Sequence, residues 1–219
     1  MHRHQYRTRL GAVSIALAGV LFALYEIAAP RADQTTLEGA ASWTSAGWAL
    51  AHIAAIVGLI LIPLAWSALR NHLAAAGAAG PERTAFLAAA TGAVGSGLTI
   101  SYYGAEVYGL KAIGAHAVAE GDAALTAVGD DFRMDPTAVT VFAIGLALIA
   151  VAAVLAAIAV WRSGTLHRWS AVPLAAMMVL YLPQFFVPHP VRIAWGALVA
   201  AGSLWIAWEL WRAARRTGT

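Results

Sequence analysis

Apolar runs about 20 residues long recur along the whole chain, and this feature limits its fold more than any other. A helix of about 20 residues is about 30 Å long, which matches the hydrocarbon core of a membrane. Only 11% of the residues are charged, whereas soluble domains usually carry roughly 25%. Because the chain lacks the charge to cover a surface in water, we predict an all-α integral membrane protein with no soluble domain.

Six segments are long and apolar enough to be transmembrane helices, and we expect one bundle over residues 1–219. The expected spans are residues 10–30, 44–69, 84–110, 137–161, 170–188 and 191–211. The first span follows a basic leader and precedes "IAAPRA", so a cleaved signal peptide is an alternative there. Tyr25 and Glu26 argue against cleavage, because they interrupt the stretch where a cleavage region would be bland.

The basic residues are unevenly divided between the two sides of this bundle. With the N-terminus inside, ten of the fourteen fall in inner segments, and the outer four are Arg31, Lys111, Arg133 and Arg192. Since Lys and Arg are enriched in cytoplasmic connections, we expect both termini in the cytoplasm. Arginine far outnumbers lysine and alanine is abundant, as in high-GC bacteria, so we expect the bacterial cytoplasmic membrane.

Four ionisable residues fall near the outer ends of four different segments: Glu26, His52, Glu106 and His189. The rise of 1.5 Å per helical residue puts them at similar depth. An ionisable side chain inside a span is costly, and it is by default a candidate for function.

Helical spacing adds aromatic neighbours to these four residues. Tyr102 and Tyr103 share a helix stripe with Glu106, and Trp48 lies one turn before His52. We therefore predict a ligand-binding pocket that opens outward. Its expected lining is Glu26, His52, Tyr102, Tyr103, Glu106 and His189, with Tyr25, Trp48 and Gln184 beside them.

Three kinds of chemistry fit such a pocket. Glu106 or Glu26 would act as a general acid or proton carrier, or the two would hold a cationic or hydroxylated ligand among the tyrosines. Carboxylates and imidazoles also suit zinc, iron or manganese. However, the metal-binding spacings H-E-x-x-H and Glu-x-x-His do not occur, so we expect no metal. A haem held by two histidines is not expected either, because only His52 lies deep in a span, and we therefore expect no cofactor.

Other classes of protein lack their motifs here. Cysteine is absent, which excludes thiolate metal sites and cysteine nucleophiles. Neither G-x-x-x-x-G-K-[ST] nor G-x-S-x-G is present. The basic residues form no patch, so we expect membrane lipids and no nucleic acid as partners.

Glycine and proline predict local features of the spans. Gly92, Gly95 and Gly97 predict a face for close helix packing, with docking of a membrane partner as the alternative. Pro183 lacks an N–H, so the fifth span should kink in its outer third. Asp135 and Pro136 should begin the fourth span as N-cap and first helical residue. A surface helix is expected over residues 115–128. The third and sixth spans both end with a glutamate between aromatic residues, so an inverted repeat of two three-helix halves is an open alternative.

The layout resembles uncharacterised six-span membrane proteins of high-GC bacteria. The resemblance lies in the basic leader, "WALAHIAAIVGLILIPLAWSALR", the aromatic and acidic end of the third span, and the "WR" close. It implies a six-helix bundle and supplies no function. From the residues we expect small-ligand or ion binding, related to transport. The alternatives are an intramembrane enzyme acting on a lipid or isoprenoid, and an accessory subunit that buries its acids against loop arginines.

Overall fold

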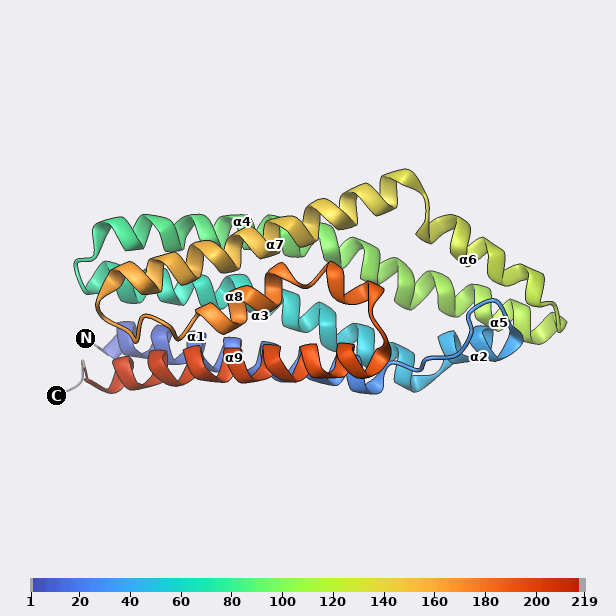
Figure 1. The fold of residues 1–219 in the computed structure, drawn as a ribbon, viewed down its shortest axis with the longest axis horizontal. Helices are drawn as coiled ribbons and strands as arrows, with labels where there is room; N and C mark the ends of the chain where they lie inside the picture. Colours follow the sequence, from blue (N-terminus) through green and yellow to red (C-terminus); the bar gives the residue numbers. More distant parts are fainter. Residues whose placement is uncertain (1, 217–219) are drawn as a thin grey trace.

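Long helices make up most of the computed structural model, which describes residues 2–216. Five are long and apolar enough to cross a membrane: α1 (His2–Ala28), α3 (Ala46–Ala75), α4 (Ala79–Ala105) with its continuation to Glu120, α7 (Pro136–Ser163) and α9 (His189–Arg216). They lie lengthwise beside one another, and both termini are at the same end (Figure 1). The expected all-α fold is confirmed, since the described residues contain no strand. Met1 and residues 217–219 lie outside them.

The expected fifth span, residues 170–188, is not one helix. It contains α8 (Val172–Val179), a turn, and the short 3₁₀ helix η3 (Pro183–Phe186). Pro183 explains the break, because its ring would clash with the carbonyl four residues earlier, and that residue is Val179. The kink expected at Pro183 is thus a complete end to the helix. The segment between α7 and α9 nevertheless runs along the bundle (Figure 1).

Three short helices project beyond the end of the bundle that is opposite the termini (Figure 1). They are α2 (Leu37–Thr44), α5 (Lys111–Glu120) and α6 (Thr126–Arg133), and we call them the cap. The single surface helix expected over residues 115–128 is thus two helices, parted by the 3₁₀ turn η2 (Ala123–Leu125). The cap has a small core of its own around the buried side chains of Trp43 and Leu110.

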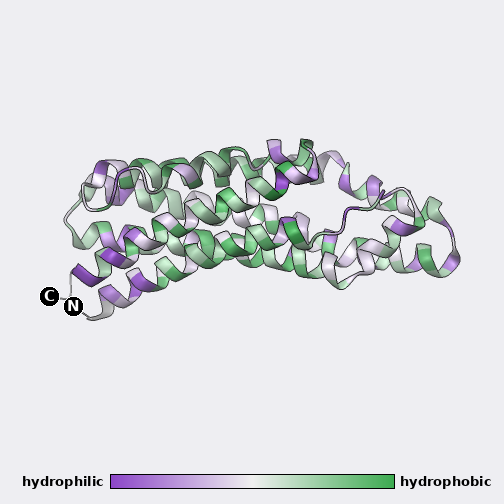
Figure 2. Cartoon of the chain, turned by 60° about the horizontal axis from the view of Figure 1, so that its bottom comes forward, coloured by the Kyte–Doolittle hydropathy of each residue, from purple (hydrophilic) through white to green (hydrophobic). Residues whose placement is uncertain are grey.

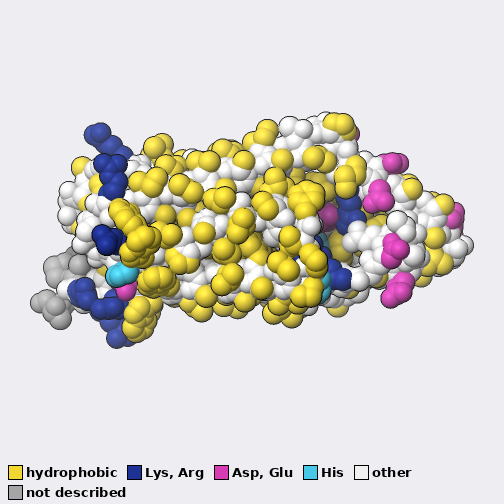
Figure 3. Space-filling model, in the orientation of Figure 1, with side chains coloured by type: hydrophobic (Ala, Val, Ile, Leu, Met, Phe, Trp, Pro, Cys, Tyr) yellow, Lys and Arg dark blue, Asp and Glu magenta, His cyan; other side chains and the backbone are white. Residues whose placement is uncertain are grey.

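Hydropathy and charge divide the molecule along its length. The long helices are mostly hydrophobic along their middle parts (Figure 2), and on the face that Figure 3 shows, acidic side chains gather on the cap and most basic ones at the end with the termini. Apolar helices between two polar ends are typical of a membrane-embedded protein.

Small residues bring α4 and α7 close together. A Cβ added to Gly95 would lie 2.7 Å from the carbonyl oxygen of Gly145 on α7, and one added to Gly92 would touch Ala152. Gly97, in contrast, faces open space. Two of the three glycines therefore serve packing within the chain. At the start of α7, the carboxylate of Asp135 accepts from two backbone N–H groups, as expected of its N-cap.

Candidate functional site

Glu106 lies where the long helix leaves the bundle for the cap. Residues Glu106–Leu110 form a π-helical turn, η1, that joins α4 to α5 without a break. Such a turn holds an extra residue and leaves backbone groups without their usual partners. The indole N–H of Trp48 donates to the carbonyl of Glu106 at 3.3 Å, so α3 is fixed against this turn.

The Glu106 carboxylate meets His52 inside the bundle. His52 Nε2 is 3.0 Å from Glu106 Oε2, and His52 Nδ1 is 2.8 Å from the carbonyl oxygen of Trp48. A carbonyl only accepts, so Nδ1 must carry a proton. The contact between Nε2 and Oε2 then needs a proton of its own, held by either the imidazole or the carboxyl group. Both residues are buried, with 2% and 8% of their surfaces exposed.

Arg133, the last residue of α6, binds the other side of the same carboxylate. Its Nε donates to Glu106 Oε1 at 2.9 Å, and its Nη1 donates to Gln34. The guanidinium lies over the rings of Trp43 and Trp48, 5.5 and 5.7 Å from their centroids. The carboxylate thus lies between an imidazole from α3 and a guanidinium from the cap. We call Glu106, His52 and Arg133 the Glu106 triad.

Glu26 forms a second buried centre with arginines. Its carboxylate accepts from Arg31 at 2.9 Å and from both Nε and Nη2 of Arg192, at 3.0 and 3.2 Å. The Glu26 side chain is completely buried, and His189 Nε2 reaches its backbone carbonyl at 3.0 Å. Burial, followed by the neighbouring charge of Arg192, lowers the pKa of Arg31. Two guanidinium groups therefore share one carboxylate here.

Aromatic rings fill the space around and between these two centres. The ring of Tyr25 stands edge-on to those of His52 and Tyr103, with centroids 5.5 and 5.6 Å apart. The hydroxyl of Tyr103 is 3.0 Å from that of Tyr181, which belongs to the broken segment after α8. The tyrosines thus tie α1, α4 and the broken segment together.

The structure brings the expected site residues into two groups. His52, Tyr103 and Glu106 meet with Trp48 and Tyr25, whereas Glu26 and His189 meet around Arg192. Tyr102 stacks on Phe142 and lines an outer groove of about 330 Å³. Gln184 lines a separate groove, and its buried amide has no partner among the described residues. Hydrogen-bond partners surround both acids, where an open pocket was expected.

The arginines are the functional residues that sequence reasoning missed. In the sequence, Arg31, Arg133 and Arg192 counted only as positive charges of the expected outer segments. Their role could have been predicted from the charges in the sequence. Few basic residues are expected near Glu26 and Glu106, and buried acids need positively charged partners. The side chain of Lys111 is exposed, and Glu209 pairs with Arg212 at 3.3 Å.

No protein-family model, curated protein or solved structure matches this chain. The resemblance to six-span proteins of high-GC bacteria therefore stays a prediction, and function must be argued from the site itself.

Proposed function

We propose that this chain is a multi-pass protein of the bacterial cytoplasmic membrane that binds a proton at the Glu106 triad, near its outer face. In this proposal the broken segment around α8 completes six crossings, and both termini are cytoplasmic. The basic end with the termini and the acidic cap support that orientation.

The observation that carries the proposal is the contact between His52 and Glu106. Because Nδ1 is committed to the carbonyl of Trp48, the Nε2–Oε2 contact at 3.0 Å requires one proton. A second proton would neutralise the carboxyl group and leave imidazolium and guanidinium facing it without a counter-charge. Loss of the first proton would leave the lone pair of His52 Nε2 facing the negatively charged Glu106 carboxylate, and the two would repel each other. Either change alters the contact between the bundle and Arg133 of the cap.

Proton binding would therefore be communicated to the cap. Arg133 connects Glu106 to Gln34, and Gln34 lies in the chain between α1 and α2. External acidity is thus the signal that best fits this arrangement. The sequence predicted that the site binds a small ligand or an ion. We narrow this prediction to a proton, because a proton needs no open pocket.

Nuclear magnetic resonance of histidine labelled with ¹⁵N tests this proposal directly. The nitrogen shifts distinguish the imidazolium from the neutral Nδ1–H tautomer, and His52→Asn assigns the signal. The ¹³C shift of the Glu106 carboxyl group is followed as well, because the proton can be received there, and acidification should change at least one of the two signals reversibly. If neither the His52 signal nor the Glu106 carboxyl signal changes on acidification, the proposal is wrong.

The accessory-subunit alternative also has an observation in its favour. Both buried acids are bound by arginines, Glu106 by Arg133 and Glu26 by Arg31 and Arg192. This is the feature expected if the charges only hold helices together. Signals of His52 and Glu106 that both stay unchanged on acidification would favour this alternative, because the triad would then be a fixed ion-pair network.

A further inference from the structure

A groove of about 420 Å³ lies on the outside of the bundle between α7 and α8, far from the Glu106 triad. Val154 and Ile158 of α7 and Val179 of α8 form its walls, at helical spacings along each helix. Ala157 and Ala175, which are both buried, contribute only methyl groups to its lining. The groove is therefore an apolar channel, suited to a narrow and flexible hydrocarbon chain.

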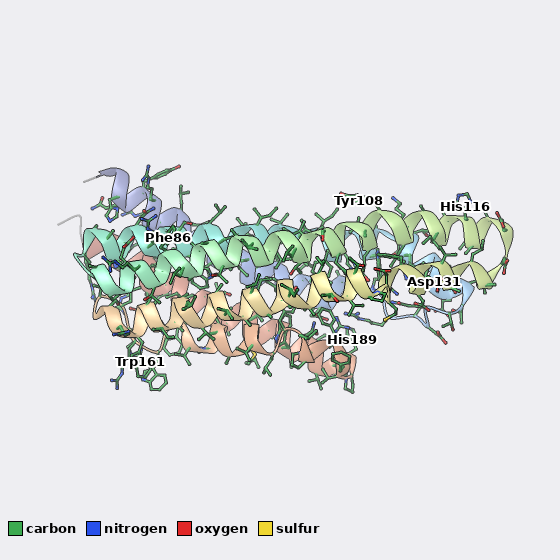
Figure 4. The ribbon with its side chains drawn as sticks, turned by 90° about the horizontal axis from the view of Figure 1, so that it is seen from above. Phe86, Tyr108, His116, Asp131, Trp161 and His189 are labelled. Carbon is green, nitrogen blue, oxygen red and sulfur yellow. The ribbon has the colours of Figure 1, made fainter. Side chains whose placement is uncertain are left out.

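The α7 end of the groove nearest the termini is basic and aromatic. Trp161 and Arg162 line it there, and Trp161 extends away from the bundle (Figure 4). The guanidinium of Arg168 lies 5.2 Å from the ring centroid of Trp161 and 6.0 Å from that of Trp169. Exposed tryptophans beside arginines are typical of the level of lipid headgroups.

Among the described residues, neither of these two arginines forms an ion pair, although the Glu209 carboxylate accepts from the backbone N–H of His167 beside Arg168 at 3.3 Å. The acidic residues at this end are Glu82 and Glu209, and they pair with Arg70 and Arg212. Within residues 4–216, neither Arg162 nor Arg168 has a carboxylate at ion-pair distance. Two positive charges thus adjoin the mouth of an apolar groove.

We propose that this groove is a binding site for one anionic phospholipid. An acyl chain lies along the apolar walls, and the phosphate accepts hydrogen bonds from Arg162 and Arg168, whose forked donors suit phosphate oxygens. Charge complementarity selects this occupant, because an apolar helix of a partner protein would gain nothing from these two arginines. The inference is independent of proton binding at the Glu106 triad.

Native mass spectrometry of the purified full chain in detergent tests the site. The probes are dioleoyl phosphatidylglycerol and dioleoyl phosphatidylcholine, added separately at equal concentrations. The anionic lipid should be retained as one tightly bound copy, and the zwitterionic lipid much less. Arg162→Gln with Arg168→Gln should weaken phosphatidylglycerol binding about thirtyfold, the effect of two arginines near a charged headgroup.

Arg83→Gln is the matched control, because Arg83 is an exposed arginine near the same end but outside the groove. It should leave lipid retention unchanged. Equal retention of both lipids by the original chain, or no loss in the double variant, would overturn the proposal.

A second pair of variants tests the acyl-chain channel separately from the charges. Ala176 is exposed and lines the groove, so Ala176→Phe should fill it and reduce retention of both lipids. Ala147→Phe makes the same change at an exposed position of α7 outside the groove, and it should have no effect. Retention of phosphatidylglycerol by Ala176→Phe would contradict the channel. Soluble glycerol phosphate, which has no acyl chain, should not compete with phosphatidylglycerol for the groove. Competition would show that the site binds only the headgroup.

Discussion

At the scale of single residues, three arginines and two acids organise the end of the bundle that carries the cap. Arg133 binds Glu106, and Arg31 and Arg192 bind Glu26. Lys111, which begins α5 of the cap, is exposed. Isolated charges are rarely buried unless they are paired, so each acid and its arginines depend on one another.

Removal of the charge at Glu106 should therefore be costly. In Glu106→Gln, Arg133 would stay buried without its counter-ion, and the free energy of unfolding should fall by about 3 kcal/mol. Chemical denaturation in detergent measures the change. Glu120→Gln, which removes an exposed acid farther along the same helix, should shift it by less than about 0.5 kcal/mol. Similar losses in both variants would show that Arg133 does not depend on Glu106.

The paired hydroxyls of Tyr103 and Tyr181 give a second test. Tyr103→Phe would leave the buried hydroxyl of Tyr181 without this partner, at a cost of about 1–3 kcal/mol. Tyr181→Phe should cost less, because the hydroxyl of Tyr103 also interacts with that of Tyr25. The double variant should cost clearly less than the sum of the two, since both polar groups are then gone. Strict additivity in this double-mutant cycle would mean that the two hydroxyls do not interact.

At the scale of helices, glycine decides how closely α4 and α7 pack. Gly95 and Gly145 allow the two backbones to touch, which is a common means of helix association in membranes. Since Glu106 directly follows α4 and α7 begins three residues after Arg133, this contact joins the two helices that lead to Glu106 and Arg133.

Two alanine substitutions on α4 should therefore have opposite effects. The methyl group of Gly95→Ala would lie 2.7 Å from the backbone oxygen of Gly145, so α4 and α7 must separate, at a cost of about 1–3 kcal/mol. Gly97→Ala meets nothing within 4 Å, and it should stabilise the helix by up to about 1 kcal/mol. Thermal unfolding in detergent compares the two. A neutral Gly95→Ala would contradict the close packing.

The limits of sequence reasoning also appear at the scale of helices. Hydropathy located the five long helices because burial in lipid requires long apolar stretches. It counted residues 170–188 as another because a count of apolar side chains ignores the backbone bond that Pro183 removes. The partnership of His52 and Glu106 was predicted from their similar depth. The contact of Arg133 with Glu106 was not predicted. It depends on how the cap folds, and the periodicity of apolar residues gives no information about that fold.

At the scale of the whole molecule, the two ends should lie on opposite sides of the membrane. The chain has no cysteine, so single cysteines can report their own side without background. In intact cells, a membrane-impermeant maleimide should label Ala119→Cys in the cap and not Ala76→Cys between α3 and α4, although both positions are exposed. The reverse pattern would invert the proposed orientation, and labelling at both positions would argue against a membrane-spanning bundle.

The segments α4, η1 and α5 form one continuous helix that extends from the bundle into the cap. Its 42 residues form a helix about 60 Å long, rooted in the bundle and ending in the tip of the cap. The π turn at Glu106 holds one residue more than an α-helical turn, so its return to α geometry would rotate the outer arm by about 100°. A change in the contacts of Glu106, at the base of this helix arm, would therefore be transmitted along the helix to the tip of the cap.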